Sequence, residues 1–289
     1  MNDLEQMAIE RLKAASEMSI TVYQQPLVIC ISGGKDSGVI TELAVRSGIP
    51  CEFQHNHTTA DAPETVRFVR SEFKRLEELG YKCTVNMPAY KGKRVSMWSL
   101  IPQKLMPPTR LVRYCCSVLK ETGGAGRFIC TGVRWAESVS RKNNRGIYEK
   151  LGATKDKRIT LVNDNDEKRM LFENCRLKAT RVVNPIIDWA DEDVYGFLKD
   201  AKVPMNPLYA EGRCRVGCIG CPMAGTKVRE AAFARWPKYK QLYLNAFERM
   251  LEERKRRGKE SSWATAEEVF RWWMEYDVLP GQESMEDFQ

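Results

Sequence analysis

The sequence predicts an α/β protein with a doubly wound parallel sheet, followed by a C-terminal helical portion. Short apolar segments alternate with segments of helical periodicity over the first two thirds of the chain, and the connections between them are short. After Gly225 this alternation gives way to segments with aromatic residues at helical spacing. We therefore expect a sheet domain at residues 1–225 and a helical region at 226–289.

The elements of the first half follow one another with clear boundaries. The N-terminal residues, MNDLEQMAIERLKAASEM, are charged and amphipathic, which predicts a helix rather than a signal peptide. Apolar runs predict strands at 27–31, 51–55, 82–87 and 128–132. Helical spacing at 37–47 and 63–79 ends at Gly48 and Gly80, a residue typical of helix C-termini.

The second half begins with a polar, irregular stretch. Residues 141–180 indicate a long loop or an insertion, and a strand near Val182-Val183 and a helix from Asp191 to Ala201 follow it. Helical spacing returns at 227–257 and 265–276, with aromatic residues that we expect to pack against one another.

Composition indicates an ordinary globular protein. Of the 289 residues, 43% are hydrophobic and 29% charged, and no apolar run approaches the length of a membrane span, so we expect a cytoplasmic protein. The net charge is +8, with basic clusters at Lys91, Lys93 and Arg94 and at 254–257. These clusters fit either solvated surface or a surface for nucleic acid.

The junction between the first strand and the first helix after it carries the sequence SGGKDS, residues 32–37. Glycines let the backbone curl so that successive N–H groups point inward, and the helix N-terminus adds partial positive charge. Ser32, Lys35 and Ser37 add hydroxyl donors and a cation. The spacing differs from the common mononucleotide loop G-x-x-x-x-G-K-[ST], but the chemistry predicts a phosphate site.

Ten cysteines are many for a chain expected in a reducing compartment, where disulfides are rare. Five are scattered among apolar neighbours and are expected to be small buried side chains. These five are Cys30, Cys51, Cys83, Cys130 and Cys175.

The other five cysteines are clustered, which is typical of metal sites. They are Cys115, Cys116, Cys214, Cys218 and Cys221. Four thiolates suit zinc or an iron–sulfur cluster, and a proline after the last cysteine is typical of ferredoxin runs. Free or redox-active thiols are the third alternative, and five candidates for four positions leave the ligand set open.

The two histidines, His55 and His57, end the second predicted strand. There they either make structural hydrogen bonds or contact a ligand.

These motifs together resemble a known family. SGGKDS is similar to the pyrophosphate loop of the ATP pyrophosphatase (PP-loop) superfamily, and further segments resemble its PAPS reductase-like branch. These segments are TTADAPET at 58–65, TGVRWAES at 131–138 with Arg141, NPIIDW at 184–189 with DEDV at 191–194, and NPLY at 206–209. The resemblance covers roughly residues 25–225 and implies an adenine-nucleotide alpha hydrolase-like core.

The resemblance also implies site residues. An adenine nucleotide, ATP or PAPS, would bind through Ser32, Gly33, Gly34, Lys35, Asp36, Ser37, Asp61, Arg134, Glu137 and Arg141. Lys35 and Asp36 would be catalytic, with Asp36 helping to hold Mg²⁺. Relatives with a Cys-Cys pair and a later Cys-x-x-Cys hold a four-iron cluster, which here implies Cys116, Cys218 and Cys221. Cys115 is then the family-like fourth ligand, and Cys214 its rival.

Two chemistries compete. The complete SGGKDS loop resembles the members that cleave ATP to AMP and pyrophosphate, as tRNA-thiolating and DNA-phosphorothioating enzymes do. This favours sulfur transfer to a nucleic-acid or small-molecule acceptor, with a sulfur-donor protein as a further partner. The alternative is a sulfonucleotide (PAPS or APS) reductase, whose nucleophilic cysteine lies near the C-terminus, whereas no cysteine follows Cys221. A third hypothesis is a non-catalytic nucleotide-binding regulator with a structural metal centre.

Overall fold

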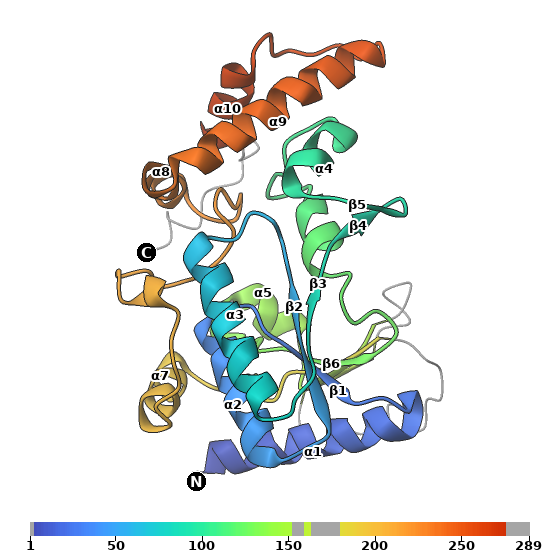
Figure 1. The fold of residues 1–289 in the computed structure, drawn as a ribbon, viewed down its shortest axis with the longest axis vertical. Helices are drawn as coiled ribbons and strands as arrows, with labels where there is room; N and C mark the ends of the chain where they lie inside the picture. The colour runs from blue at the N-terminus through green and yellow to red at the C-terminus, as the bar shows by residue number, and fades with distance from the viewer. Residues whose placement is uncertain (1–2, 152–158, 163–179, 276–289) are drawn as a thin grey trace. The chain divides into compact units, whose positions relative to one another are not determined.

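The computed structural model describes residues 3–151, 159–162 and 180–275 (Figure 1). The chain forms two compact units. The first contains residues 1–56, 63–86 and 123–216, and the second contains residues 57–62, 87–122 and 217–289. None of the helices in the described ranges is both long and apolar enough to cross a membrane.

A seven-stranded sheet forms the centre of the first unit. Its strands are β1 (Leu27–Cys30), β2 (Cys51–Asn56), β3 (Cys83–Asn86), β6 (Phe128–Cys130), β7 (Tyr148–Lys150), β8 (Ile159–Leu161) and β9 (Arg181–Val183). They are ordered β3-β2-β1-β6-β9-β7-β8. The first five in this order are parallel, with Val28 opposite Glu52 and Ile129, whereas β7 is antiparallel to both of its neighbours. The mostly parallel sheet predicted from the alternation is confirmed.

The region 141–180 differs from the long loop expected from its polarity. It contains most of α5 (Val139–Asn144) and the two antiparallel strands β7 and β8. The strand β7 reads Tyr-Glu-Lys, and Glu149 is fully buried because Arg145 and Asn184 bond to its carboxylate. These hydrogen bonds offset the cost of burying the carboxylate, and a strand whose central buried residue is charged shows no apolar pattern in the sequence. Residues 152–158 and 163–179, with Cys175, lie outside the described residues.

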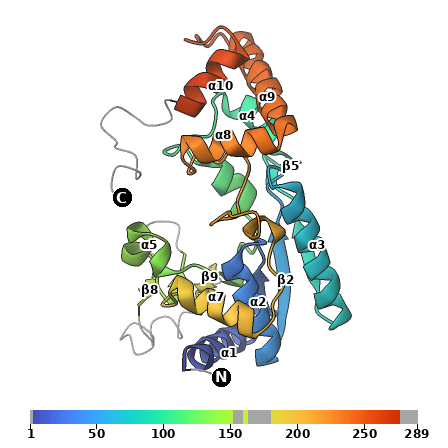
Figure 2. The same ribbon diagram turned by 90° about the vertical axis from the view of Figure 1, so that its left-hand side faces the viewer.

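Helices cover both faces of the sheet. They are α1 (Asp3–Tyr23), α2 (Lys35–Ser47), α3 (Pro63–Glu78) and α7 (Asp191–Asp200). Helix α2 packs against α1 and α7, and Figure 2 shows α2 and α7 on one side of β2 and α3 on the other. Gly48 ends α2 in a left-handed conformation and donates to the carbonyl of Val45, as expected from the sequence.

The second unit is mainly helical. It contains the hairpin β4 (Ala89–Tyr90) and β5 (Lys93–Arg94), α4 (Met97–Lys104), the π-helical turn η1 (Cys116–Lys120), α8 (Thr226–Arg235), α9 (Pro237–Arg256) and α10 (Ala266–Glu275). The predicted aromatic packing is present, with Phe233, Tyr243, Phe247 and Trp273 in mutual ring contact. The helix expected over 227–257 is broken before Pro237, which has no N–H to continue it.

The segments that form the second unit come from both sides of residue 225, where the sequence predicted a division. Helices α8 to α10 join residues 57–62 and 87–122, which the sequence analysis placed with the sheet. Polar and aromatic contacts hold these segments together. Trp273 donates to the carbonyl of Pro108, and Tyr239 donates to that of Asp61.

Candidate functional site

The order of the strands predicts where a ligand binds in the first unit. The chain proceeds from β1 to β2 on one side and later places β6 on the other side of β1. At such a switch the connections leave the carboxyl ends of β1 and β6 in opposite directions and open a crevice. The loop 32–37 follows β1, Arg134 follows β6, and Asp191 follows β9.

The loop 32–37 requires glycine at its second position. Gly33 has φ of +78°, and a Cβ there would lie 2.9 Å from Cγ2 of Thr65. Asn206 fixes the same turn by donating to the carbonyl of Gly33 and to the hydroxyl of Thr65, both at 3.1 Å. The loop is therefore held in shape from α3 and from the NPLY segment.

Hydroxyl oxygens accept hydrogen bonds from the loop amides that would face a phosphate. Gly34 N–H donates to Oγ of Ser32 at 3.3 Å, and Lys35 N–H donates to the hydroxyl of Tyr209 at 2.9 Å. Gly34 is the N-cap of α2 and offers no side chain to cap it. An anion can take the place of these neutral acceptors, because charged acceptors bind amides more strongly.

Two cations and two carboxylates surround the loop. Arg134, only 1% exposed, donates from Nε to Asp36 at 2.7 Å and from Nη2 to Asp191 at 2.6 Å. Nζ of Lys35 lies 3.1 Å from Asp36 and 3.0 Å from Asp191. A third bond from Arg134, to the carbonyl of Trp189 at 3.0 Å, ties it to the segment after β9.

These contacts shift the pKa values of the groups involved. The hydrogen bond from Lys35, together with Arg134, lowers the pKa of Asp191. Burial acts to lower the pKa of Lys35, but the bond to Asp191 and the charge of Asp36 outweigh it and raise that pKa. Lys35 and Asp191 are thus both charged at neutral pH, and the positive charge of the site is balanced by carboxylates that an incoming phosphate must displace or share.

The remaining predicted residues are distributed between the two units. In the first unit, Arg141 pairs with Glu137, and burial lowers the pKa of its guanidinium. Ser37 donates to the carbonyl of Gly34 at 2.8 Å, which secures the start of α2. Asp61 belongs to the second unit, where its carboxylate accepts from the Thr58 amide at 3.0 Å.

The two histidines make different contacts. His55 is buried, and its Nδ1 lies 2.8 Å from the carbonyl of Ile31, which fits the structural role considered above. In the second unit, Nδ1 of His57 lies 3.7 Å from the Asp61 carboxylate.

A small cavity in the second unit is lined by four of the five clustered cysteines. Its lining residues are Thr58, Met97, Cys115, Cys116, Leu119, Lys120, Cys218, Cys221, Pro222 and Tyr243. Two thiols come from the start of η1 and two from the loop 217–221, so the fold brings together segments about a hundred residues apart. The fifth, Cys214, is exposed and belongs to the first unit.

Cationic and hydroxyl groups surround the four thiols. A hydrogen bond from Cys115 and another from Arg113, 3.2 Å from the sulfur, lower the pKa of Cys116 to about 5. Burial raises the pKa of Cys218, an effect that Lys120 opposes, and its sulfur lies 3.4 Å from the Thr58 hydroxyl. Thiolates are the metal-binding form of cysteine, and this setting favours that form at Cys116.

The four thiols that line this cavity fit either of the two centres considered from the sequence, a zinc ion or an iron–sulfur cluster.

The loop that carries Cys218 and Cys221 depends on one of its two glycines. Gly220 has φ of +70°, and a Cβ there would lie 2.8 Å from both Phe233 and Tyr243. Gly217 has a φ that other residues adopt and open space around it. Of the two glycines, only Gly220 is sterically required.

Comparison with known proteins finds the same family that the sequence motifs resemble. The model of the phosphoadenosine phosphosulfate (PAPS) reductase domain matches residues 26–224. The chain belongs to this family.

The similar proteins have low sequence identity to this chain or match only part of it. An uncharacterized protein of Methanocaldococcus jannaschii is 25% identical over 94% of this chain and 59% of its own length. An adenosine 5'-phosphosulfate reductase of Burkholderia cepacia is 40% identical over 37% of this chain and 41% of its own. The chain thus spans about half the length of these relatives. The PAPS reductase structure from Candida auris covers 73% of this chain, and the match covers 93% of that structure, at 16% identity and a TM-score of 0.44.

Several residues at these sites were not singled out from the sequence. Tyr209, Asn206 and Asp191 hold the loop and its cations, although the segments containing them were noted as landmarks of the PAPS reductase-like branch. Gly132 lies so close to α2 that a Cβ would meet the backbone of Asp36 at 2.9 Å. Only their positions within these motifs could have identified them from the sequence. A residue that acts through a single contact has no effect on hydrophobic periodicity.

Proposed function

We propose that this member of the PAPS reductase domain family cleaves ATP between the α- and β-phosphates and uses the adenylate to activate a substrate for sulfur transfer. The observation that carries the proposal is the complete SGGKDS loop, in which the Asp36 carboxylate contacts both Lys35 and the buried Arg134. In this reaction an acceptor oxygen attacks the α-phosphorus, and the bond to the bridging oxygen breaks toward pyrophosphate. The acceptor is a nucleic acid or a small molecule.

The residues of the first unit supply the groups that pyrophosphate release needs. The loop amides and Lys35 would hold the β- and γ-phosphates, and Arg134 would add a second cation. Mg²⁺ bound with ATP would neutralise the leaving group, and Asp36 offers it a carboxylate oxygen. Tyr209 would release the Lys35 amide as the nucleotide arrives.

We further propose that Cys115, Cys116, Cys218 and Cys221 hold a four-iron cluster. When bound, such a cluster supplies a place to hold sulfide for transfer. Arg113 and Lys120 would offset the negative charge of four thiolates. The apolar residues that line the cavity, Met97 and Tyr243 among them, would limit access of water.

The Lys35→Ala variant tests the nucleotide chemistry. Calorimetry should show that the wild-type protein binds Mg·ATP more tightly than PAPS, and that Lys35→Ala binds Mg·ATP at least tenfold more weakly. Lys199→Ala removes an exposed lysine of α7 and should bind like the wild-type protein. Pyrophosphate formation at an unchanged rate in Lys35→Ala would refute the proposal.

The same titration decides the alternative of a sulfonucleotide reductase, which the similarity to the Burkholderia cepacia enzyme favours. Preferential binding of PAPS or APS would support that alternative. The exposed Cys214 would then be the first candidate for the nucleophile.

The Cys218→Ser variant tests the cluster and its ligand set. Protein purified without oxygen should be brown, and Cys218→Ser should lose iron, sulfide and the visible absorption together. Cys214→Ser should keep all three, because Cys214 does not line the cavity. Zinc in place of iron, or a full iron content in Cys218→Ser, would overturn the assignment.

A further inference from the structure

The second unit contains a long stretch with only one sign of charge. Residues 87–120 include seven lysines and arginines and no acidic residue, although the chain's average composition would place about four there. Over the whole described part of the second unit, 19 basic residues stand against 10 acidic ones. The excess charge of the protein is therefore concentrated in this unit.

Four of these seven cations already have partners. Lys104 donates to the hydroxyl of Tyr90 at 3.1 Å, and Arg110 donates to the carbonyl of Pro222 at 3.0 Å. Arg113 and Lys120 lie beside the cysteines. The other three, Lys91, Lys93 and Arg94, are exposed on the β4–β5 hairpin.

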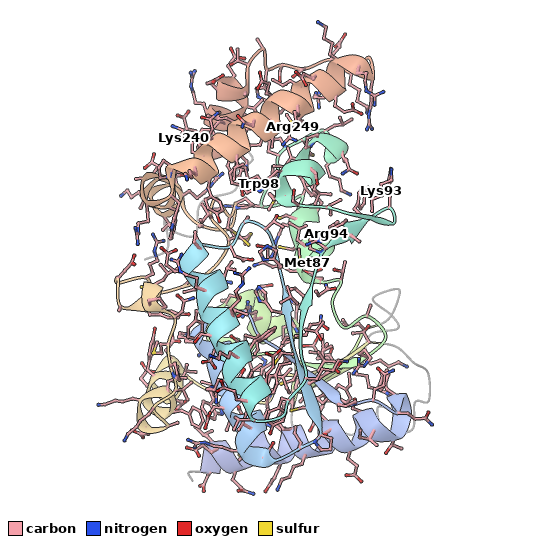
Figure 3. All side chains as sticks on the ribbon, in the orientation of Figure 1. Met87, Lys93, Arg94, Trp98, Lys240 and Arg249 are labelled. Atoms are coloured by element: carbon pink, nitrogen blue, oxygen red, sulfur yellow. The ribbon has the colours of Figure 1, made fainter. Side chains whose placement is uncertain are left out.

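No described acidic residue pairs with the hairpin cations. Among the described residues, none of the three makes an ion pair or a side-chain hydrogen bond, and Lys91 only lies over the ring of Tyr90. Arg249 of α9 extends the group, because its Nη2 bonds to the carbonyl of Trp98, four residues after Arg94. Figure 3 shows Lys93 and Arg94 on β5, Trp98 on α4 and Arg249 on α9.

The second basic cluster, at the end of α9, behaves differently. Arg256 and Arg257 both pair with Glu253, at 2.6 and 2.5 Å, and Arg254 donates to the carbonyl of Leu105. That cluster is therefore solvated and paired surface. From composition alone the two clusters were equivalent, and their ion pairs distinguish them.

We propose that the β4–β5 hairpin, with Arg249, binds the phosphate backbone of a nucleic acid. The cations are spread over the hairpin and a helix rather than gathered around one point, which suits a polymer with repeated charges better than a single anion. The nearby aromatic side chain of Trp98 packs against Tyr239 and Tyr243, so it does not offer a free face for base stacking. Binding should therefore depend on salt and little on sequence.

The inference rests on the proposed function only for its purpose, which is to hold the acceptor; the binding itself needs no ATP cleavage. The test uses fluorescence anisotropy of labelled 20-nucleotide RNA and of a 20-base-pair DNA duplex, with anaerobically prepared full-length protein and no ATP. The wild-type protein should bind either probe or both, with an affinity that falls steeply with salt. Failure to bind both at 50 mM salt would overturn the inference and leave the nucleotide chemistry untouched.

Two matched double variants locate the surface. Lys93→Gln with Arg94→Gln should lower the affinity at least tenfold at physiological salt and reduce the log–log salt slope by about two. Arg256→Gln with Arg257→Gln removes the same charge from paired residues and should change the affinity less than twofold. Equal losses in both would mean that net charge alone acts, which contradicts a defined surface.

A competitor separates nucleic acid from an acidic protein partner. Polyglutamate at an equal concentration of charge should displace RNA poorly, because its carboxylates do not match the spacing or charge density of a phosphate backbone. Displacement as efficient as that by unlabelled RNA would overturn the inference in favour of an acidic polypeptide. Unfolding by urea should be the same in all variants, since the substituted side chains are exposed.

Discussion

At the scale of single residues, the positive charges beside the loop 32–37 are balanced by carboxylates: Lys35 and Arg134 both contact Asp36 and Asp191. Asp191 bonds both Lys35 and Arg134, yet its side chain is 58% exposed, so it is the partner that a phosphate can displace most easily. Asp36 is more buried, at 23% exposed. We infer that Asp191 competes with phosphate for the two cations, and that it positions them when the site is empty.

The Asp191→Asn variant should therefore bind pyrophosphate more tightly, by up to about tenfold, which corresponds to about 1.4 kcal/mol. Calorimetry measures this directly. Asp200→Asn makes the same charge change at the end of the same helix and should leave the affinity unchanged. Weaker binding by Asp191→Asn would show instead that its main effect is to hold Lys35 and Arg134 in place.

The lowered pKa of Asp191 also determines the direction in which its contribution to the free energy of unfolding changes with pH. Its ion pairs stabilise the fold above the unfolded pKa of about 3.9 and are lost as pH falls through the lower folded value. Because the side chain is largely exposed, the contribution is below about 1 kcal/mol. Asp191→Asn should lack this small loss of unfolding free energy below pH 4.

At the scale of elements, the loop 217–221 joins the cysteine site to the aromatic core of the second unit. Tyr243 donates to the carbonyl of Ile219, and Ile219 N–H bonds to the carbonyl of Ala60. The loop therefore takes its shape from α9 and from residues 57–62 together. Its dependence on Gly220 follows, since Phe233, Tyr243 and Trp273 leave no room for a Cβ.

Gly220→Ala should lower the free energy of unfolding by about 2–4 kcal/mol, through a left-handed backbone and an overpacked core. It should also reduce the iron content, because Cys218 and Cys221 lie on either side. Gly217→Ala, in open space beside the same cysteine, should change both quantities little. Urea unfolding and iron analysis check the pair; equal stability of the two variants would contradict the packing argument.

At the scale of the whole molecule, chemistry and charge are divided between the units. The first unit carries the loop 32–37 and its balanced cations, and the second carries four cysteines and the hairpin cations, which have no acidic partner among the described residues. This division fits an enzyme that activates one substrate with a small anionic nucleotide and takes the other from a large polyanion.

The sequence alone determined the parallel sheet, the glycine-containing loop 32–37 and the set of five cysteines, because apolar periodicity, glycine positions and clustered thiols are local signals. Only the tertiary structure decided which four cysteines share a cavity and that Asp191 and Tyr209 reach the loop. It also decided that Glu149 is buried in a strand and that, among the described residues, the hairpin cations have no acidic partner whereas Arg256 and Arg257 pair with Glu253. Each of these depends on a contact between residues distant in the chain or on the neighbours of a charge. Such contacts leave no periodic trace in the order of the amino acids.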